Sequence, residues 1–246
     1  MYLTRFPVNA ARSHSRALLS SPHLMHGAVN AAFPDLGAAP PDGKGPRVLW
    51  RLDHRPTGGV DLLITSPRRP DLTHLVEQAG WPTLPEPGWT SFAYGEFLDS
   101  LASDSVWRFR LTANPVHYIR RDDTPHAPTR RAGHRTPSRQ IEWLLRRQEA
   151  AGFEVLPTPA EQRMLPGGDD HMVSVERRLP LRFRRGNTER RADVRVNQVS
   201  YEGVLRATDV NRLRRTLTQG LGKGRAYGCG LMTLAAPTGI RLEGAS

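Results

Sequence analysis

Five glycines lie within an eleven-residue string near the end of the chain, Gly220-Leu-Gly-Lys-Gly-Arg-Ala-Tyr-Gly-Cys-Gly230. Glycine allows a positive φ and the close approach of another backbone. The amides of Gly222 and Gly224, flanked by Lys223 and Arg225, are suited to binding phosphates. The string is not a Walker A loop, because that loop follows a strand and begins a helix. The alternative interpretation is a tight helix-to-strand turn without a ligand.

A dense group of arginines precedes this string. Eight of them fall within nineteen residues around Gly186-Asn187, in a pattern that predicts a β-hairpin. A solvated charged hairpin is the alternative, but so many charges of one sign repel each other and favour a polyanion as partner. The eight are Arg177, Arg178, Arg182, Arg184, Arg185, Arg190, Arg191 and Arg195. Arg130, Arg131 and Arg135 lie in an earlier Pro- and His-rich loop, which is either disordered or an extension of this basic surface.

The charge of the chain is unevenly distributed. Residues 1–104 carry 9 basic and 10 acidic side chains, whereas residues 105–246 carry 26 and 14. This asymmetry predicts that the second half binds a polyanion. The single cysteine cannot form a disulfide within the chain, no run approaches the ~18 apolar residues of a membrane helix, and no signal peptide is recognisable. We therefore expect a cytoplasmic protein that is not bound to a membrane.

Two histidines, His23 and His26, are spaced to share one face of a predicted helix. Imidazole titrates near neutral pH and serves as a general acid or a general base. Two ligands do not complete a metal site, and no cysteine pair, His-Glu-x-x-His string or carboxylate cluster supplies the others, so we predict no metal and no cofactor. Cys229 lies between glycines before an apolar strand, where packing is a better interpretation than a nucleophilic role.

The elements that must position these residues occur in the same order twice. The first half predicts a strand at 2–8, a helix at 22–33, strands at 47–53 and 60–65, a helix at 71–78 capped by Asp71, and a strand at 89–97. The second half predicts a strand at 106–112, a polar loop to 136, a helix at 138–151, strands at 153–156, 171–185 and 194–207, a helix at 209–219 capped by Asp209, and a strand at 229–235.

The order βαββαβ, found twice, predicts an α+β protein with two tandem ferredoxin-like domains of the kind found in RNA-recognition modules. We place the first domain at residues 1–98, the linker at 99–105 and the second domain at 106–246. Two such sheets would leave a cleft between them, which is a natural path for an extended polymer.

The glycines form two Gly-hydrophobic-Gly groups separated by five residues, and this arrangement resembles the glycine-rich loop of the RAMP superfamily of CRISPR-associated proteins. Segment 201–235 resembles the C-terminus of the CasE branch, the precursor-RNA endoribonuclease of type I-E systems. Further similar segments follow in matching order along the chain: Met1-Tyr-Leu-Thr4, Leu24-Met-His26 with Phe33-Pro34, Trp107-Arg-Phe-Arg-Leu-Thr-Ala-Asn-Pro115 and Ile141-Glu-Trp143-Leu. The family's tandem ferredoxin-like fold coincides with the repeat described above.

The resemblance implies that His26 is catalytic, by its place in the first helix seven residues before Phe33. His23 stands where family members carry a tyrosine. It replaces that tyrosine's hydrogen bond, acts as a second acid or base, or is simply exposed. Residues 27–32 are neutral, whereas some relatives carry basic residues there, so the charge of the phosphorane must be stabilised by Lys223, Arg225 or arginines near the chain start.

The resemblance thus implies a metal-independent endoribonuclease. It would cut CRISPR precursor RNA once, at the 3′ base of the repeat stem-loop, by attack of the 2′-hydroxyl, and remain on the product as a subunit of the type I-E surveillance complex. The residues predicted to bind RNA are Arg177, Arg178, Arg182, Arg184, Arg185, Arg190, Arg191, Gly222, Lys223, Gly224 and Arg225. The alternative is a non-catalytic scaffold that holds the RNA hairpin, for which His26 has no purpose. A DNA-binding regulator is disfavoured, because no helix-turn-helix is recognisable.

Overall fold

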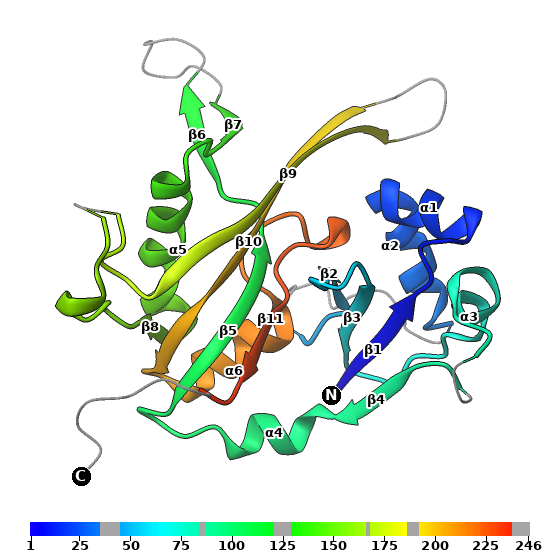
Figure 1. Ribbon diagram of the computed structural model, residues 1–246, viewed down its shortest axis with the longest axis horizontal. Coiled ribbons are helices and arrows are strands. Elements are labelled where there is room, and N and C mark those ends of the chain that lie inside the picture. The colour runs from blue at the N-terminus through cyan, green and yellow to red at the C-terminus, as the bar shows by residue number, and fades with distance from the viewer. Residues whose placement is uncertain (35–44, 84–86, 121–128, 166–167, 186–191, 238–246) are drawn as a thin grey trace.

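A computed structural model describes residues 1–34, 45–83, 87–120, 129–165, 168–185 and 192–237 (Figure 1). Two antiparallel sheets, each with helices on one side, lie next to each other in it. Within this described part, every helix is either too short or too polar to cross a membrane.

The first half forms a four-stranded sheet in the order β2-β3-β1-β4, and all its strand pairs are antiparallel. The first and third strands of the unit are central, which is the ferredoxin-like arrangement that the sequence predicts. Its elements are β1 (Tyr2–Val8), α1 (Ser13–Ser20), α2 (Pro22–Ala31), β2 (Leu49–His54), β3 (Val60–Ser66), α3 (Thr73–Ala79) and β4 (Thr90–Ala93).

The second half forms a sheet in the order β11-β5-β10-β8, with the long strand β9 also paired to β10. Strands β5 and β10 are central, so the same topology recurs with β8 and β9 sharing the place of the second strand. Its elements are β5 (Val106–Ala113), β6 (Val116–Arg120), β7 (Thr129–Gly133), α5 (Pro137–Ala151), β8 (Phe153–Val155), η1 (Ala160–Gln162), β9 (Val173–Arg185), β10 (Ala192–Ala207), α6 (Val210–Gln219), η2 (Arg225–Tyr227) and β11 (Met232–Ala235).

Several elements differ from the sequence-based predictions. The fourth strand ends at Ala93, and helix α4 (Tyr94–Ser100) follows it, because Tyr94 and Leu98 are one helical turn apart and are both buried against the core of the second half. Helix α1 was not predicted, nor was the β6–β7 hairpin inside the supposed polar loop. The last strand begins at Met232 instead of Cys229.

Local sequence determines where the helices begin and end. Ser21 caps α2 by accepting a hydrogen bond from the Leu24 amide at 3.3 Å, and Pro22 occupies the first turn. Asp209 caps α6 as predicted. Asp71 does not occupy the N-cap position of α3. Instead its carboxylate accepts from the amide and the hydroxyl of Thr73, just before the helix.

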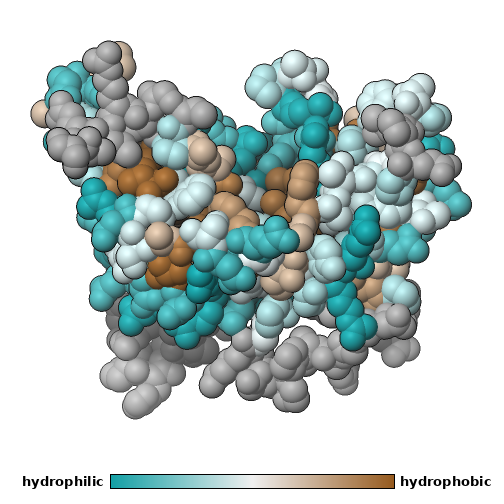
Figure 2. All heavy atoms as spheres, turned by 90° about the horizontal axis from the view of Figure 1, so that it is seen from below, coloured by the Kyte–Doolittle hydropathy of each residue, from teal (hydrophilic) through white to brown (hydrophobic). Residues whose placement is uncertain are grey.

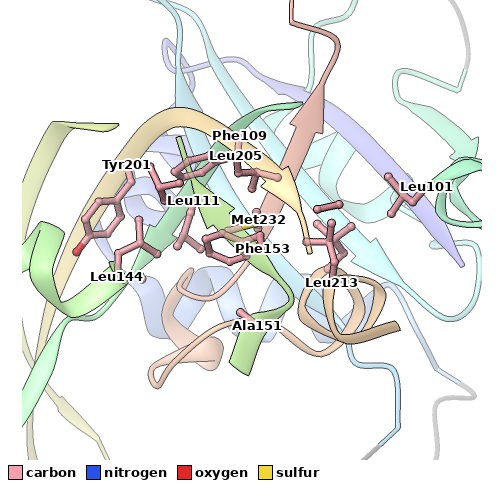
Figure 3. Close-up of a cluster of buried hydrophobic side chains, with 14 of the residues drawn as sticks. Leu101, Phe109, Leu111, Leu144, Ala151, Phe153, Tyr201, Leu205, Leu213 and Met232 are labelled. Carbon is pink, nitrogen blue, oxygen red and sulfur yellow. The ribbon is translucent and has the colours of Figure 1, made fainter. Parts of the chain in front are cut away.

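Two hydrophobic cores hold the two sheets to their helices. The core of the second half, drawn in Figure 3, places β5, β8, β10 and β11 against α5 and α6, with Phe109, Leu111 and Tyr201 among its buried members. Leu101, after α4, also belongs to it. The other core packs α1, α2 and α3 against β1, β2 and β3. The face below α4 carries polar residues interspersed with small hydrophobic spots (Figure 2).

A buried arginine connects the two halves. Arg51 on β2 is 1% exposed and forms a bidentate ion pair with Asp53, at 2.7 and 2.8 Å. Its guanidinium also donates to the Arg110 carbonyl on β5, the Leu231 carbonyl and the Thr233 hydroxyl on β11. Every contact therefore helps to compensate for burying its charge, and the two sheets are fixed to each other at this point.

Candidate functional site

Helix α2 carries the histidine pair and is fixed from both sides. Pro22, Met25 and Val29 form its buried face. On the neighbouring helix α3, His74 Nε2 donates a hydrogen bond to the Ala28 carbonyl at 2.9 Å. His26 is consequently held at the edge of the buried face, half-buried, whereas His23 one turn earlier is exposed.

The His26 ring contacts Asn30, one turn further along α2. The Asn30 Nδ2 atom lies 3.2 Å from His26 Nε2. An amide nitrogen only donates, so Nε2 is the acceptor in this contact. An imidazole with a free-base Nε2 is the form that removes a proton from a hydroxyl group. Asn30 was missed by the sequence analysis, although its i,i+4 spacing from His26 was a readable signal.

The glycine-rich string runs between α6 and β11 and packs against both halves of the molecule. A Cβ on Gly228, which has a φ of +73°, would lie 2.7 Å from the Trp50 ring on β2. A Cβ on Gly222, with a φ of +83°, would lie 3.0 Å from the Trp143 ring on α5. The turn and the close packing therefore require glycine at these two positions. This agrees with the interpretation of the string as a tight helix-to-strand turn.

The turn η2 within this string contacts helix α2 directly. Figure 1 shows the loop reaching from the second sheet toward α1 and α2. Segments that are about 200 residues apart in the sequence thus meet, and the helix of His26 lies beside the string predicted to bind phosphate.

The two basic residues of the string have different surroundings. Arg225 is half-buried and donates to the Gly220 carbonyl at 2.9 Å, and burial, together with the nearby charge of Arg47, lowers its pKa. It thus has a structural role in holding the loop closed. Lys223 is exposed, and its ammonium contacts the Tyr118 hydroxyl and lies 4.8 Å from the centre of that ring. Of the two, Lys223 presents its charge at the surface.

The predicted arginine hairpin is formed by β9 and β10, and its two faces differ. The register pairs Leu179 with Gln198 and Leu181 with Val196 on one face. That face approaches α1, α2 and β2, and its Phe183 ring packs edge-on against Tyr227 of η2, with centroids 4.8 Å apart. The opposite face carries Arg178, Arg182 and Arg195.

The other predicted arginines have separate positions. Arg177 lies on the face toward β2, and its charge, together with burial as the larger cause, lowers the pKa of His54. Arg184 and Arg185 end β9 and pair in register with Asp193 and Ala192. Arg190 and Arg191, predicted to bind RNA, lie outside the described residues.

A wide groove of about 1400 Å³ lies within the second half, between the β6–β7 and β9–β10 hairpins. Between the two halves, α1, α2, β2, β9 and the glycine-rich loop surround a smaller cavity of about 70 Å³, which Trp50 also lines. The polymer path expected between the two sheets stays a prediction.

The remaining candidate chemistry is limited. Among the described residues, no group of three or more His, Cys, Asp or Glu side chains is arranged to hold a metal ion. Cys229 is fully buried, and burial raises the pKa of its thiol far above the usual value. A thiol kept protonated in this way is a packing group and not a nucleophile.

Two ferredoxin-like units, with a glycine-rich loop before the last strand that contacts the helix carrying His26, are the arrangement of the RAMP class that the sequence resembles. The chain belongs to the CRISPR-associated protein family, whose model matches residues 1–236. It is 30% identical over 237 residues to the CRISPR-associated endoribonuclease Cse3 of Thermus thermophilus, a match that covers 96% of this chain and all of that protein.

Solved structures agree with this membership. The structure of Thermus thermophilus Cse3 bound to an RNA that represents a pre-cleavage complex is similar with a TM-score of 0.68 at 28% identity, covering 95% of this chain and 98% of the other. A chain of a CRISPR RNA-guided surveillance complex shares the fold, with a TM-score of 0.62 at 24% identity and coverage of 96% and 99%.

Proposed function

We propose that this protein is a metal-independent endoribonuclease that cleaves CRISPR precursor RNA at the 3′ base of the repeat stem-loop. The observation that carries the proposal is the contact of α2 with η2, which brings the helix of His26 to the glycine-rich string. An acid–base group and a phosphate-binding loop at one place are what RNA cleavage requires.

The chemistry follows from the RNA's own nucleophile. The RNA's 2′-hydroxyl takes the place of the Asn30 amide at His26 Nε2, which then accepts the hydroxyl proton as that oxygen attacks the adjacent phosphorus. The bond to the 5′-oxygen breaks, and this leaving oxygen takes up a proton from solvent. The products are a 2′,3′-cyclic phosphate and a 5′-hydroxyl. Lys223 is the exposed cation of the string and is our candidate for stabilising the phosphorane charge.

Binding of the RNA stem is assigned to the arginine hairpin. A uniform A-form helix hides its base edges in a deep groove, so arginines contact mainly its phosphates, with base contacts near the stem end. The product would stay bound, and the protein would act as a subunit of the type I-E surveillance complex. We place the reaction in the cytoplasm, because the proposed substrate is a transcript made there.

The experiment is cleavage of end-labelled repeat RNA by the pure protein in EDTA, with mapping of both new ends. We expect full cleavage to one cyclic-phosphate end and one 5′-hydroxyl end. A 2′-deoxy nucleotide immediately upstream of the cut should stop cleavage and leave binding intact. Activity only with added magnesium, or cleavage of the deoxy substrate, would contradict the mechanism. Tight binding without any cleavage would identify a non-catalytic scaffold instead.

A further inference from the structure

The groove between the two hairpins is basic on both walls. Arg178, Arg182 and Arg195 line it from the β9–β10 side, and Arg135, after β7, lines it from the other. One contact between the two walls is a hydrogen bond from the Arg178 guanidinium to the Arg135 carbonyl, at 3.3 Å. Asp193, the one acidic side chain among the described lining residues, is paired to Arg182 at 2.9 Å, so the groove keeps a net positive charge.

Amide side chains line the groove between these walls. Asn114 accepts from the Asn197 backbone amide at 3.1 Å, and the Asn197 side chain donates to the His134 carbonyl. Gln140 is only 1% exposed, and its Nε2 donates to the same carbonyl. Among the described residues, the Gln140 Oε1 atom has no hydrogen-bond partner. An unsatisfied acceptor at this depth is costly unless a ligand donates to it.

An aromatic side chain stands near the groove on β6, in the register set by its pairing with β7. Tyr118 is 57% exposed, and Lys223 is in contact with its hydroxyl. Gly224, which follows Lys223 in the glycine-rich string, lines the groove together with Tyr227. An exposed aromatic ring and a cation therefore lie side by side next to Gly224 of the groove lining, and such a pair is suited to stacking on a base and binding a phosphate.

These three features together suit single-stranded nucleic acid. Arginines bind phosphates of any RNA, but amides are useful for recognition only where base edges are accessible, and stacking on an aromatic ring needs an unpaired base. We propose that this groove binds unpaired nucleotides flanking the repeat stem, and that Tyr118 stacks on one of their bases. The proposal rests on the proposed function for its substrate, CRISPR precursor RNA.

This assignment divides the predicted RNA-binding arginines into two groups. Those along the groove hold the flank, whereas Arg184 and Arg185, nearer the hairpin end, remain with the stem. Gly224 and Tyr227 belong to the groove lining, and η2, to which Tyr227 belongs, contacts α2. A flank lying in the groove would thus continue toward the helix of His26, where the stem base must be cut.

The test compares the affinity of three RNAs carrying a 2′-deoxy nucleotide at the mapped cut: the stem-loop alone, the stem-loop with a 5′ flank, and the stem-loop with a 3′ flank. We expect wild-type protein to bind at least one flanked RNA more tightly than the bare stem-loop. Tyr118→Ala should weaken the flanked complex by about 5-fold or more, the loss of one stacked base, and leave the bare stem-loop unaffected. Tyr118→Phe should retain wild-type affinity.

Strand β10 offers a matched control pair. Arg195 lines the groove, whereas Arg206, which is also exposed, lies near the far end of the same strand. Arg195→Ala should reduce the gain in affinity that the flank gives over the bare stem-loop, and Arg206→Ala should leave this gain unchanged. Equal affinity of wild-type protein for flanked and bare RNA overturns the proposal, as does equal weakening of both by Arg195→Ala, which would place the stem in the groove. If the wild-type protein does not bind the bare stem-loop at all, the result would instead contradict the proposed function.

Discussion

At the scale of single residues, the environment of His26 separates it from the other histidine of the pair. A solitary histidine on a helix is more often structural than catalytic, and at the level of the sequence only the family resemblance favoured His26 over His23. The structure gives His26 a half-buried position, a hydrogen-bonded Nε2 and a place on the helix next to the glycine-rich loop. His23 is exposed. These differences support His26 as the proton-transfer group, in agreement with what the family resemblance implied.

We therefore expect His26→Ala to lower the single-turnover cleavage rate by about 10²- to 10⁴-fold, with little change in RNA affinity. His23→Ala should cost much less, because its side chain is exposed to solvent. Rates come from rapid mixing with saturating protein, and affinities from a filter-binding titration. A wild-type rate for His26→Ala would remove this residue from the mechanism, and a larger loss for His23→Ala would reverse the assignment.

At the scale of elements, the site depends on how the glycine-rich loop packs between β2 and α2. Gly228 immediately follows η2, and its positive φ and contact with Trp50 leave no room for a side chain. Gly27 also lies in the site region, next to His26, but it is inside a regular helix and a Cβ there would meet nothing within 4 Å. The two glycines thus differ in what they contribute to the fold.

Gly228→Ala should destabilise the protein by about 1 to 3 kcal/mol through backbone strain and overpacking, and should slow cleavage by displacing η2 from α2. Gly27→Ala should stabilise it by about 0.5 to 1 kcal/mol, since alanine loses less conformational entropy in a helix. Denaturant unfolding measures both free energies. Finding Gly228→Ala as stable and as active as wild type would show that the contact with Trp50 does not position the loop.

At the scale of the whole molecule, the two halves are joined by the hydrogen bonds of a buried arginine, Arg51. Arg51 and Asp53 come from the first sheet, while three of the groups that Arg51 contacts belong to the second. A buried pair does not stabilise a fold strongly by comparison with apolar packing, but removing one partner leaves the other charge and the carbonyls unsatisfied.

Arg51→Ala should accordingly lower the free energy of unfolding by about 3 to 5 kcal/mol. Arg5 is the matched control, because it too pairs with an aspartate, Asp61, at 3.1 Å, but is about half-exposed. Arg5→Ala should cost less than about 1 kcal/mol. Both values come from chemical denaturation at one pH and salt concentration. Similar costs for the two variants would mean that burial at the junction does not determine the contribution of Arg51.

The sequence by itself determined the two βαββαβ units, the family and the candidate residues for the chemistry, but not α1, α4 or the β6–β7 hairpin. Alternating and helical periodicities predict both βαββαβ units, and Asp209 caps its helix as expected, because such signals act within a few residues of the chain. The same local signals mislead at the fourth strand, where Tyr94 and Leu98 form a helix that packs on the distant core of the second half.

Only the tertiary structure decided which of these residues meet. The contact of η2 with α2, the hydrogen bonds of Arg51 to the second half and the groove between the two hairpins all join segments far apart in the chain. Local sequence patterns do not indicate which distant segments come into contact. The sequence assigned Arg225 and Lys223 the same role, but burial leaves only Lys223 with its charge at the surface. The sequence predicts a cleft between the sheets, but only the tertiary structure shows that side chains of both halves line a cavity of about 70 Å³ there, because packing brings Trp50 of β2 next to the glycine-rich loop and β9.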